Sequence, residues 1–143
     1  MGVVVFDSDV LIGFLNRDDA QHQPAVDRVR ASMSPGSRRL LCAVNHAEIM
    51  VGPVKAGKEA CELVWQMLSQ FSIETIAVDV EFADRAAAIR ARTGLKLQDA
   101  FALATVIHAE HRGYDDVELA SFDQDVLKAR ELIGSHKIDY RAL

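Results

Sequence analysis

The sequence contains little cysteine and no long hydrophobic run. Its two cysteines, Cys42 and Cys61, stand in apolar contexts without C-x-x-C spacing. The absence of paired spacing favours buried free thiols, which agrees with a reducing compartment. No apolar run approaches the roughly 18 residues that a membrane span requires, and the N-terminus lacks a basic region followed by an apolar signal core. These absences predict a cytoplasmic protein without a membrane segment.

Positive charge is also scarce. The chain has 16 Lys and Arg against 21 Asp and Glu, a net charge of −5, which argues against coating nucleic acid by bulk electrostatics. Two divalent cations held by carboxylates would move this balance from −5 to −1. An acidic composition therefore leaves a nucleic-acid substrate open, provided that several of the acids share a metal site.

Several catalytic motifs are missing. The sequence has no G-x-x-x-x-G-K-[ST], no G-x-S-x-G, and no G-x-G-x-x-G after its first apolar run. These gaps argue against P-loop nucleotide hydrolysis and dinucleotide redox chemistry. His108 and His111 are three residues apart, but "HAEH" is not H-E-x-x-H and no third ligand is evident. The end of an amphipathic helix is the preferred interpretation of this pair over a zinc site.

The chain does contain a regular alternation of strand and helix patterns. Short apolar or alternating runs predict strands at 2–6, 39–44, 73–78, 117–122 and, at the end of the chain, 136–140. Amphipathic or apolar segments predict helices at 9–19, 24–33, 45–52, 58–71, 80–94, 97–113 and 123–133, with Asn45 as a cap and Leu63 on an inward face. With 143 residues, this pattern predicts one α/β domain over 1–143. We expect a three-layer sandwich with a mainly parallel sheet of four to five strands and helices on both faces.

Acidic residues follow the first and fourth predicted strands. Asp7 and Asp9 come directly after "VVVF", and Asp123 and Asp125 come after "LASF". Parallel sheets bind ligands beyond the carboxyl ends of their strands, so neighbouring strands would bring these four acids to one edge. Each acid alone could simply cap a helix or face water.

Two further acids occupy apolar surroundings. Glu48 lies within "NHAEIMVGP", and Asp99 opens the apolar helix pattern at 97–113. Buried carboxylates need a partner, and clustered carboxylates raise one another's pKa unless a cation compensates. Since Mg²⁺ and Mn²⁺ prefer oxygen ligands and suit phosphate chemistry, the combined set predicts a divalent metal site.

Four stretches, "VVVFDSDVLIGFL", "AVNHAEIMVG", "LQDAFALATVIHAE" and "LASFDQDV", together resemble a PIN-domain ribonuclease. The size of the chain is similar to that of the VapC-type toxins of toxin–antitoxin pairs. The resemblance implies a metal-dependent endoribonuclease that cleaves RNA phosphodiesters through metal-activated water. It also implies a small antitoxin partner and a homodimer. The implied Mg²⁺ or Mn²⁺ ligands are Asp7, Glu48, Asp99 and Asp123. Asp125 is either a further ligand or holds the local turn, and Asp9, Asn45 and Ser121 orient ligands or water.

Two other interpretations remain open at the level of sequence. "VVVFDSDV" also resembles the nucleophile loop of haloacid-dehalogenase-like phosphatases, with Asp7 as nucleophile and Asp9 as acid and base, but no matching lysine motif follows. A phospho-acceptor receiver domain would use Asp79 after the third strand. Residues that contact RNA are not identifiable from the sequence. The basic candidates, by position alone, are Arg17, Arg38, Arg39, Lys55 and Lys96.

Overall fold

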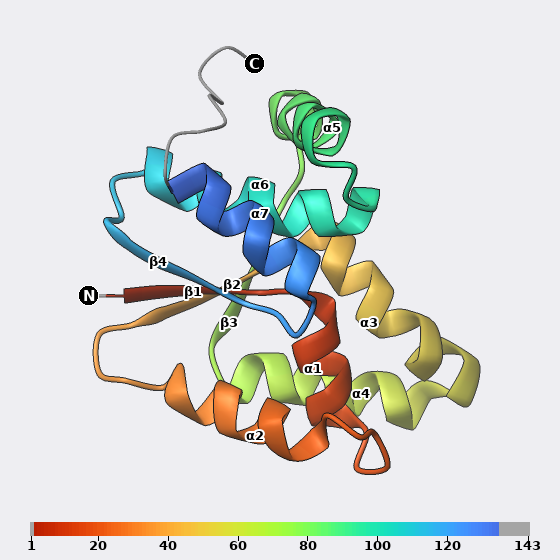
Figure 1. Cartoon of the computed structure of the whole chain (residues 1–143). Helices are drawn as coiled ribbons and strands as arrows, with labels where there is room; N and C mark the ends of the chain where they lie inside the picture. The colour runs from red at the N-terminus through yellow and green to blue at the C-terminus, as the bar shows by residue number, and fades with distance from the viewer. Residues whose placement is uncertain (1, 135–143) are drawn as a thin grey trace.

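A computed structural model describes residues 2–134 (Figure 1). Within this range the chain forms one parallel sheet of four strands in the order β3-β2-β1-β4. The strands are β1 (Gly2–Phe6), β2 (Arg38–Cys42), β3 (Ile73–Ile76) and β4 (Asp116–Ala120). The first and fourth strands are neighbours, so their carboxyl ends meet at one edge of the sheet. The strand predicted at 136–140 lies outside the described residues.

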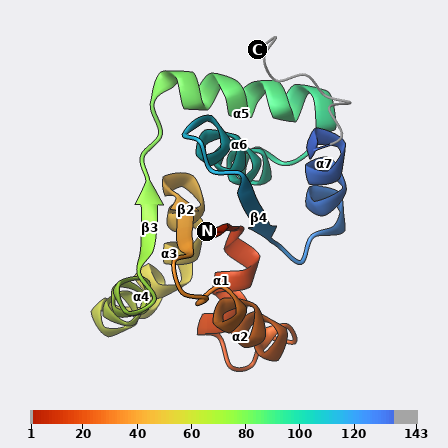
Figure 2. The same cartoon turned by 90° about the vertical axis from the view of Figure 1, so that its left-hand side faces the viewer.

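Helices connect the strands and cover both faces of the sheet (Figure 2). They are α1 (Ser8–Leu15), α2 (His22–Ala31), α3 (Ala43–Ala56), α4 (Lys58–Gln70), α5 (Val80–Thr93), α6 (Leu97–His111) and α7 (Gln124–Gly134). The alternation of β1 side chains divides the core in two. Val3 and Val5 pack with α5, α6 and α7, whereas Val4 and Phe6 pack with α1, α2, α4 and Ile49 of α3. This is the predicted three-layer α/β/α sandwich.

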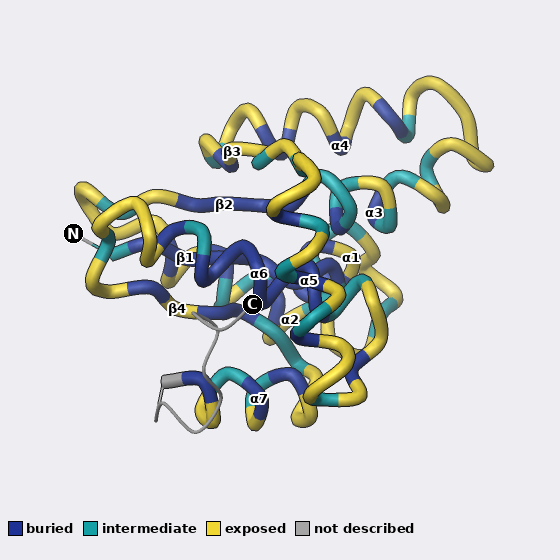
Figure 3. Tube along the Cα trace, turned by 90° about the horizontal axis from the view of Figure 1, so that it is seen from above, coloured by how far each residue is buried: buried dark blue, intermediate teal, exposed yellow. Residues whose placement is uncertain are grey.

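Helix α6 is the central helix of its layer. Its residues from Ala100 to Ile107 are all buried, as an apolar pattern on every side of a helix predicts (Figure 3). The same helix presents Asp99 in its first turn. The core therefore fixes the position of one of the predicted site carboxylates.

Three sequence predictions about the helices are wrong. Helix α1, predicted over 9–19, ends at Leu15. Helix α3 begins at Ala43, and Asn45 is a fully buried residue within its first turn instead of its cap. The Asn45 amide donates across to the Gln98 carbonyl, so this side chain joins two helices. Leu63 is 61% exposed, because the buried stripe of α4 runs through Cys61, Val64 and Met67.

The two cysteines are buried free thiols, as the sequence predicted. Burial raises the pKa of the Cys42 thiol. Among the described residues, no helix has the length and apolar content needed to cross a membrane.

Candidate active site

Asp7 stands where β1 ends and α1 begins. Its backbone N–H continues the pairing with β4 by donating to the Ala120 carbonyl at 2.9 Å. Its side chain is 2% exposed and caps α1 by accepting from the Ser8 N–H at 2.9 Å. The other carboxylate oxygen accepts from the Ser121 hydroxyl at 2.8 Å. Asp7 is thus both the helix cap and a buried acid tied to the end of β4.

Burial, together with the charges of the neighbouring Asp9 and Asp99, raises the pKa of Asp7 to about 7. The hydrogen bonds from Ser121 and Ser8 act in the opposite direction. Asp7 is therefore only partly ionised at neutral pH, and a positive charge beside these carboxylates would favour its ionised form.

Asp9 lies in the first turn of α1 and faces the loop after β4. One of its oxygens accepts from the Phe122 N–H at 2.9 Å. The other oxygen is buried and has no hydrogen-bond partner among the residues described. Burial raises the pKa of Asp9, and Asp123 contributes in the same direction. A buried carboxylate oxygen without a donor is a position that a cation or a water molecule can occupy.

Glu48 is held at the site by Asn45. The Asn45 amide donates to Glu48 Oε1 at 2.9 Å and to the Gln98 carbonyl at 3.0 Å. The Asn45 carbonyl oxygen is itself buried without a partner in the described part of the chain. Because Gln98 directly precedes Asp99, these bonds connect the glutamate of α3 to the acidic end of α6.

Asp99 is the electrostatic centre of the group. Burial raises its pKa most, followed by the charges of Asp123 and Glu48, while Lys96 lowers it. Asp9 also raises the pKa of Asp99. The charges of acids on α1, α3 and the β4–α7 loop therefore all act on Asp99, so the structure brings together acids that are distant in the sequence.

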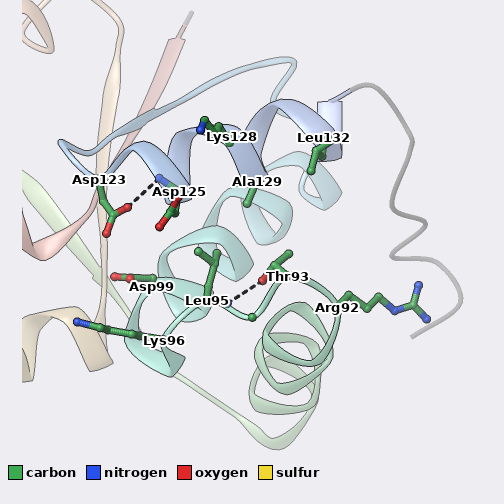
Figure 4. A pocket seen from close by; sticks show the side chains of 11 residues that line it. Arg92, Thr93, Leu95, Lys96, Asp99, Asp123, Asp125, Lys128, Ala129 and Leu132 are labelled. Atoms are coloured by element: carbon green, nitrogen blue, oxygen red, sulfur yellow. Dashed lines mark hydrogen bonds between the residues drawn. The ribbon is translucent and has the colours of Figure 1, made fainter.

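The loop after β4 is tied to Asp7 through Ser121. While the Ser121 hydroxyl donates to Asp7, it accepts from the Asp123 N–H at 3.0 Å. Asp123 accepts from the N–H groups of Asp125 and Val126 at 2.9 and 3.3 Å, so it caps α7. Both Asp123 and Asp125 are exposed, and they line the same cavity as Asp99 (Figure 4).

The donor set is made of oxygens, which suits a hard cation such as Mg²⁺ or Mn²⁺. Among residues 2–134, no three His, Cys, Asp or Glu side chains are arranged to hold a metal ion as they stand. The acids therefore share one electrostatic neighbourhood without a preformed coordination shell. The unpartnered Asp9 oxygen and the mutual effects on pKa are the observations that favour a cation here.

Two of the basic candidates are in the wrong place to contact a substrate at this edge. Arg38 and Arg39 begin β2, at the opposite end of the strands. Arg39 is 9% exposed, and its guanidinium donates to the Phe71 and Ser32 carbonyls at 2.6 and 2.8 Å. Arg38 forms an ion pair with Glu74 at 2.8 Å and donates to the Tyr114 hydroxyl. Both arginines are structural.

Sequence reasoning missed three contributors to the site. The Gln98 carbonyl and the Phe122 N–H hold Asn45 and Asp9, and backbone groups of this kind leave no signal in residue identity. Lys128 lines the cavity beside Asp125. Its spacing of three residues from Asp125 on one helix was the available signal.

Open parallel α/β sheets bind ligands beyond the carboxyl ends of their strands, and these carboxylates lie at that edge of the sheet. The sequence model of the PIN domain family matches residues 4–132, and the chain belongs to this family. PIN nucleases generally use divalent metals. Asp79, which the receiver interpretation required, caps α5 by accepting from the Phe82 N–H at 2.8 Å. Family membership favours neither the receiver nor the phosphatase interpretation.

Two solved structures share the fold. Mycobacterium tuberculosis VapC20, described as a sarcin-ricin loop cleaving toxin, has 18% identity and a TM-score of 0.67, covering 90% of this chain and 95% of that one. A toxin–antitoxin complex from Klebsiella pneumoniae has 26% identity and a TM-score of 0.63, covering 87% of this chain and 89% of that one. No curated protein sequence matches significantly.

Proposed function

We propose that the protein is a metal-dependent endoribonuclease and the toxin of a toxin–antitoxin pair. The single observation that carries the proposal is the buried carboxyl of Asp7, whose pKa burial and its acidic neighbours raise to about 7. Burial of an ionisable carboxyl beside other acids costs free energy. A side chain that only caps a helix does not require this environment. A cation that binds several of the acids together removes this cost.

The proposed ligands are Asp7, Glu48, Asp99 and Asp123, with Asp125 as a fifth candidate. Mg²⁺ or Mn²⁺ bound there supplies a Lewis acid for a phosphodiester and lowers the pKa of water. Asn45 orients Glu48, and the Ser121 hydroxyl orients Asp7. Asp9 offers its unpartnered oxygen to the same region. The fold holds these oxygens at one edge of the sheet and excludes solvent from Asp7.

RNA cleavage in the presence and absence of metal tests this proposal. The purified protein is incubated with RNA and Mg²⁺ or Mn²⁺, with and without a chelator, alongside Asp7→Asn and Asp99→Asn. We expect the wild type to cleave only with metal, and both variants to lose more than the roughly 10- to 100-fold typical of a residue that merely orients a ligand. The exposed Asp84, on α5, provides the matched control Asp84→Asn. Equal cleavage by the wild type and all three variants would contradict the proposal.

A cognate antitoxin and a homodimer complete the proposal. The Klebsiella pneumoniae structure is a toxin–antitoxin complex, and the present chain covers 89% of that chain. We expect a small partner protein to co-purify with the chain from its native host and the resulting complex to lack ribonuclease activity. Light scattering on the isolated chain tests the dimer, since a monomeric mass at micromolar concentration contradicts it.

A further inference from the structure

We propose that the cavity beside the acids holds a single-stranded RNA nucleotide next to the cleaved phosphate. In this arrangement Lys96 and Lys128 bind phosphates, while Leu95 and Leu132 contact the base. The inference rests on the proposed function, because it takes the acids as the point of cleavage. The cavity has a volume of about 570 Å³ and lies between the α5–α6 turn and α7 (Figure 4). This size falls within the roughly 300–1,000 Å³ of typical ligand sites.

The two lysines lie on different walls of the cavity. Lys96 directly precedes α6, and Lys128 lies on α7 (Figure 4). Neither ammonium group forms an ion pair with a described residue. Among residues 2–134, the one lysine that forms an ion pair is Lys58. Lys96 is near enough to Asp99 to lower the pKa of that carboxyl. In a chain of net charge −5, these ammonium groups supply local positive charge for the phosphates beside the acids.

The cavity also has an apolar part. Leu132 is 41% exposed on α7, and Leu95 lies in the turn below it, 7% exposed, with its side chain directed toward the α7 wall (Figure 4). A base in an RNA duplex is stacked and cannot enter such a space. An unstacked base of a loop or single strand can bury one face against these side chains. The apolar wall therefore selects single-stranded RNA.

The turn that carries Leu95 and Lys96 is held in place before any RNA binds. Gly94 adopts a left-handed conformation with φ of 73° and ends α5. The Arg90 guanidinium donates to the Leu95 carbonyl at 2.7 Å, and the Leu95 N–H donates to the Thr93 hydroxyl at 3.2 Å. A wall that is already ordered loses less conformational entropy when it binds a ligand.

Salt-dependent RNA binding tests the role of the lysines. Lys96→Ala and Lys128→Ala are each introduced into the Asp7→Asn protein, which we expect to bind RNA without cleaving it. The anisotropy of a labelled single-stranded RNA is then measured in Mg²⁺ at several salt concentrations. We expect each variant to bind more weakly, and the slope of log K against log salt to fall in magnitude by about 0.7 for each lost phosphate contact. The matched control is Lys58→Ala, on α4 and outside the cavity. Slopes equal to that of the control overturn the inference.

Cleavage preference tests the role of the apolar wall. Leu132→Asn, made in the otherwise wild-type protein, is assayed on RNAs that differ only in the nucleotides flanking the cleavage site. We expect an altered base preference together with an unchanged salt slope, because no phosphate contact is lost. An unaltered preference in a protein of wild-type melting temperature overturns the base contact. Failure of the wild type to cleave any RNA defeats the proposed function itself, whereas active wild type with unaffected variants defeats this inference alone.

Discussion

Asp7 places an ionisable group where the fold favours its neutral form. Its pKa is about 7 in the folded chain and near 3.8 when unfolded, so the folded state binds more protons between these values. Its contribution to stability is therefore favourable at low pH and is lost as the pH rises through about 7. The cost of ionisation is fully present at pH 8 in the absence of metal.

Replacement of Asp7 by Asn removes this cost while preserving the shape of the side chain. We expect Asp7→Asn to melt several degrees above the wild type at pH 8 in chelator, since each kcal/mol shifts the Tm of a domain of this size by about 2–4 °C. The difference shrinks at pH 5, where Asp7 is protonated in the wild type. Calorimetry at both pH values measures it, with Asp84→Asn as the control. A variant that is less stable than the wild type at pH 8 contradicts this account.

Asn45 shows what a buried amide does between two helices. Asn45→Ala leaves the Gln98 carbonyl and Glu48 without their donor. We expect a loss of about 1–3 kcal/mol in urea unfolding. In RNA cleavage we expect a loss of roughly 10- to 100-fold, as for other residues that orient a ligand. Wild-type stability and activity together would show that the two hydrogen bonds contribute nothing.

The sequence singles out candidate site acids where a carboxylate follows a strand or opens a helix. Asp7, Asp99 and Asp123 are recognisable from the pattern around them. Their hydrogen-bond partners are not, since the Phe122 N–H that holds Asp9 is a backbone group. Arg39 is a further example, because only the structure shows its guanidinium occupied by two carbonyls.

At the scale of the element, the turn between α5 and α6 depends on one backbone conformation. Gly94 has a φ of 73°, and no heavy atom lies within 4 Å of the position that a Cβ would occupy, so Gly94→Ala is penalised by the backbone alone. We expect a loss of roughly 1 kcal/mol in urea unfolding. A Gly94→Ala variant that is as stable as the wild type contradicts the argument.

Helix boundaries follow local signals only where no tertiary contact competes. Gly94 ends α5 as the sequence predicts, because the left-handed cap is a local property. Asn45 resembles a cap but is used for a contact with α6, which a local pattern cannot reveal. The spacing of apolar residues predicts that Leu63 faces the core, but its side chain lies beside the buried stripe of α4 and is exposed.

At the scale of the whole molecule, the alternation of strands and helices predicts a parallel sheet but leaves the strand order open. The order β3-β2-β1-β4 makes β1 and β4 neighbours and so brings Asp7 and Asp123 to one edge. The core helix α6 adds Asp99, and α3 adds Glu48 through Asn45. The central claim is that these acids, which are distant in sequence, form one site for a divalent cation.

Binding of Mn²⁺ measured by calorimetry tests this claim most directly, because it needs neither an RNA substrate nor a partner. We predict that the wild type and Asp84→Asn bind Mn²⁺ with equal affinity. Asp99→Asn should bind at least about tenfold more weakly, since the charge at the centre of the group is lost. Equal affinity of Asp99→Asn and the wild type, or no binding by the wild type, would contradict the account.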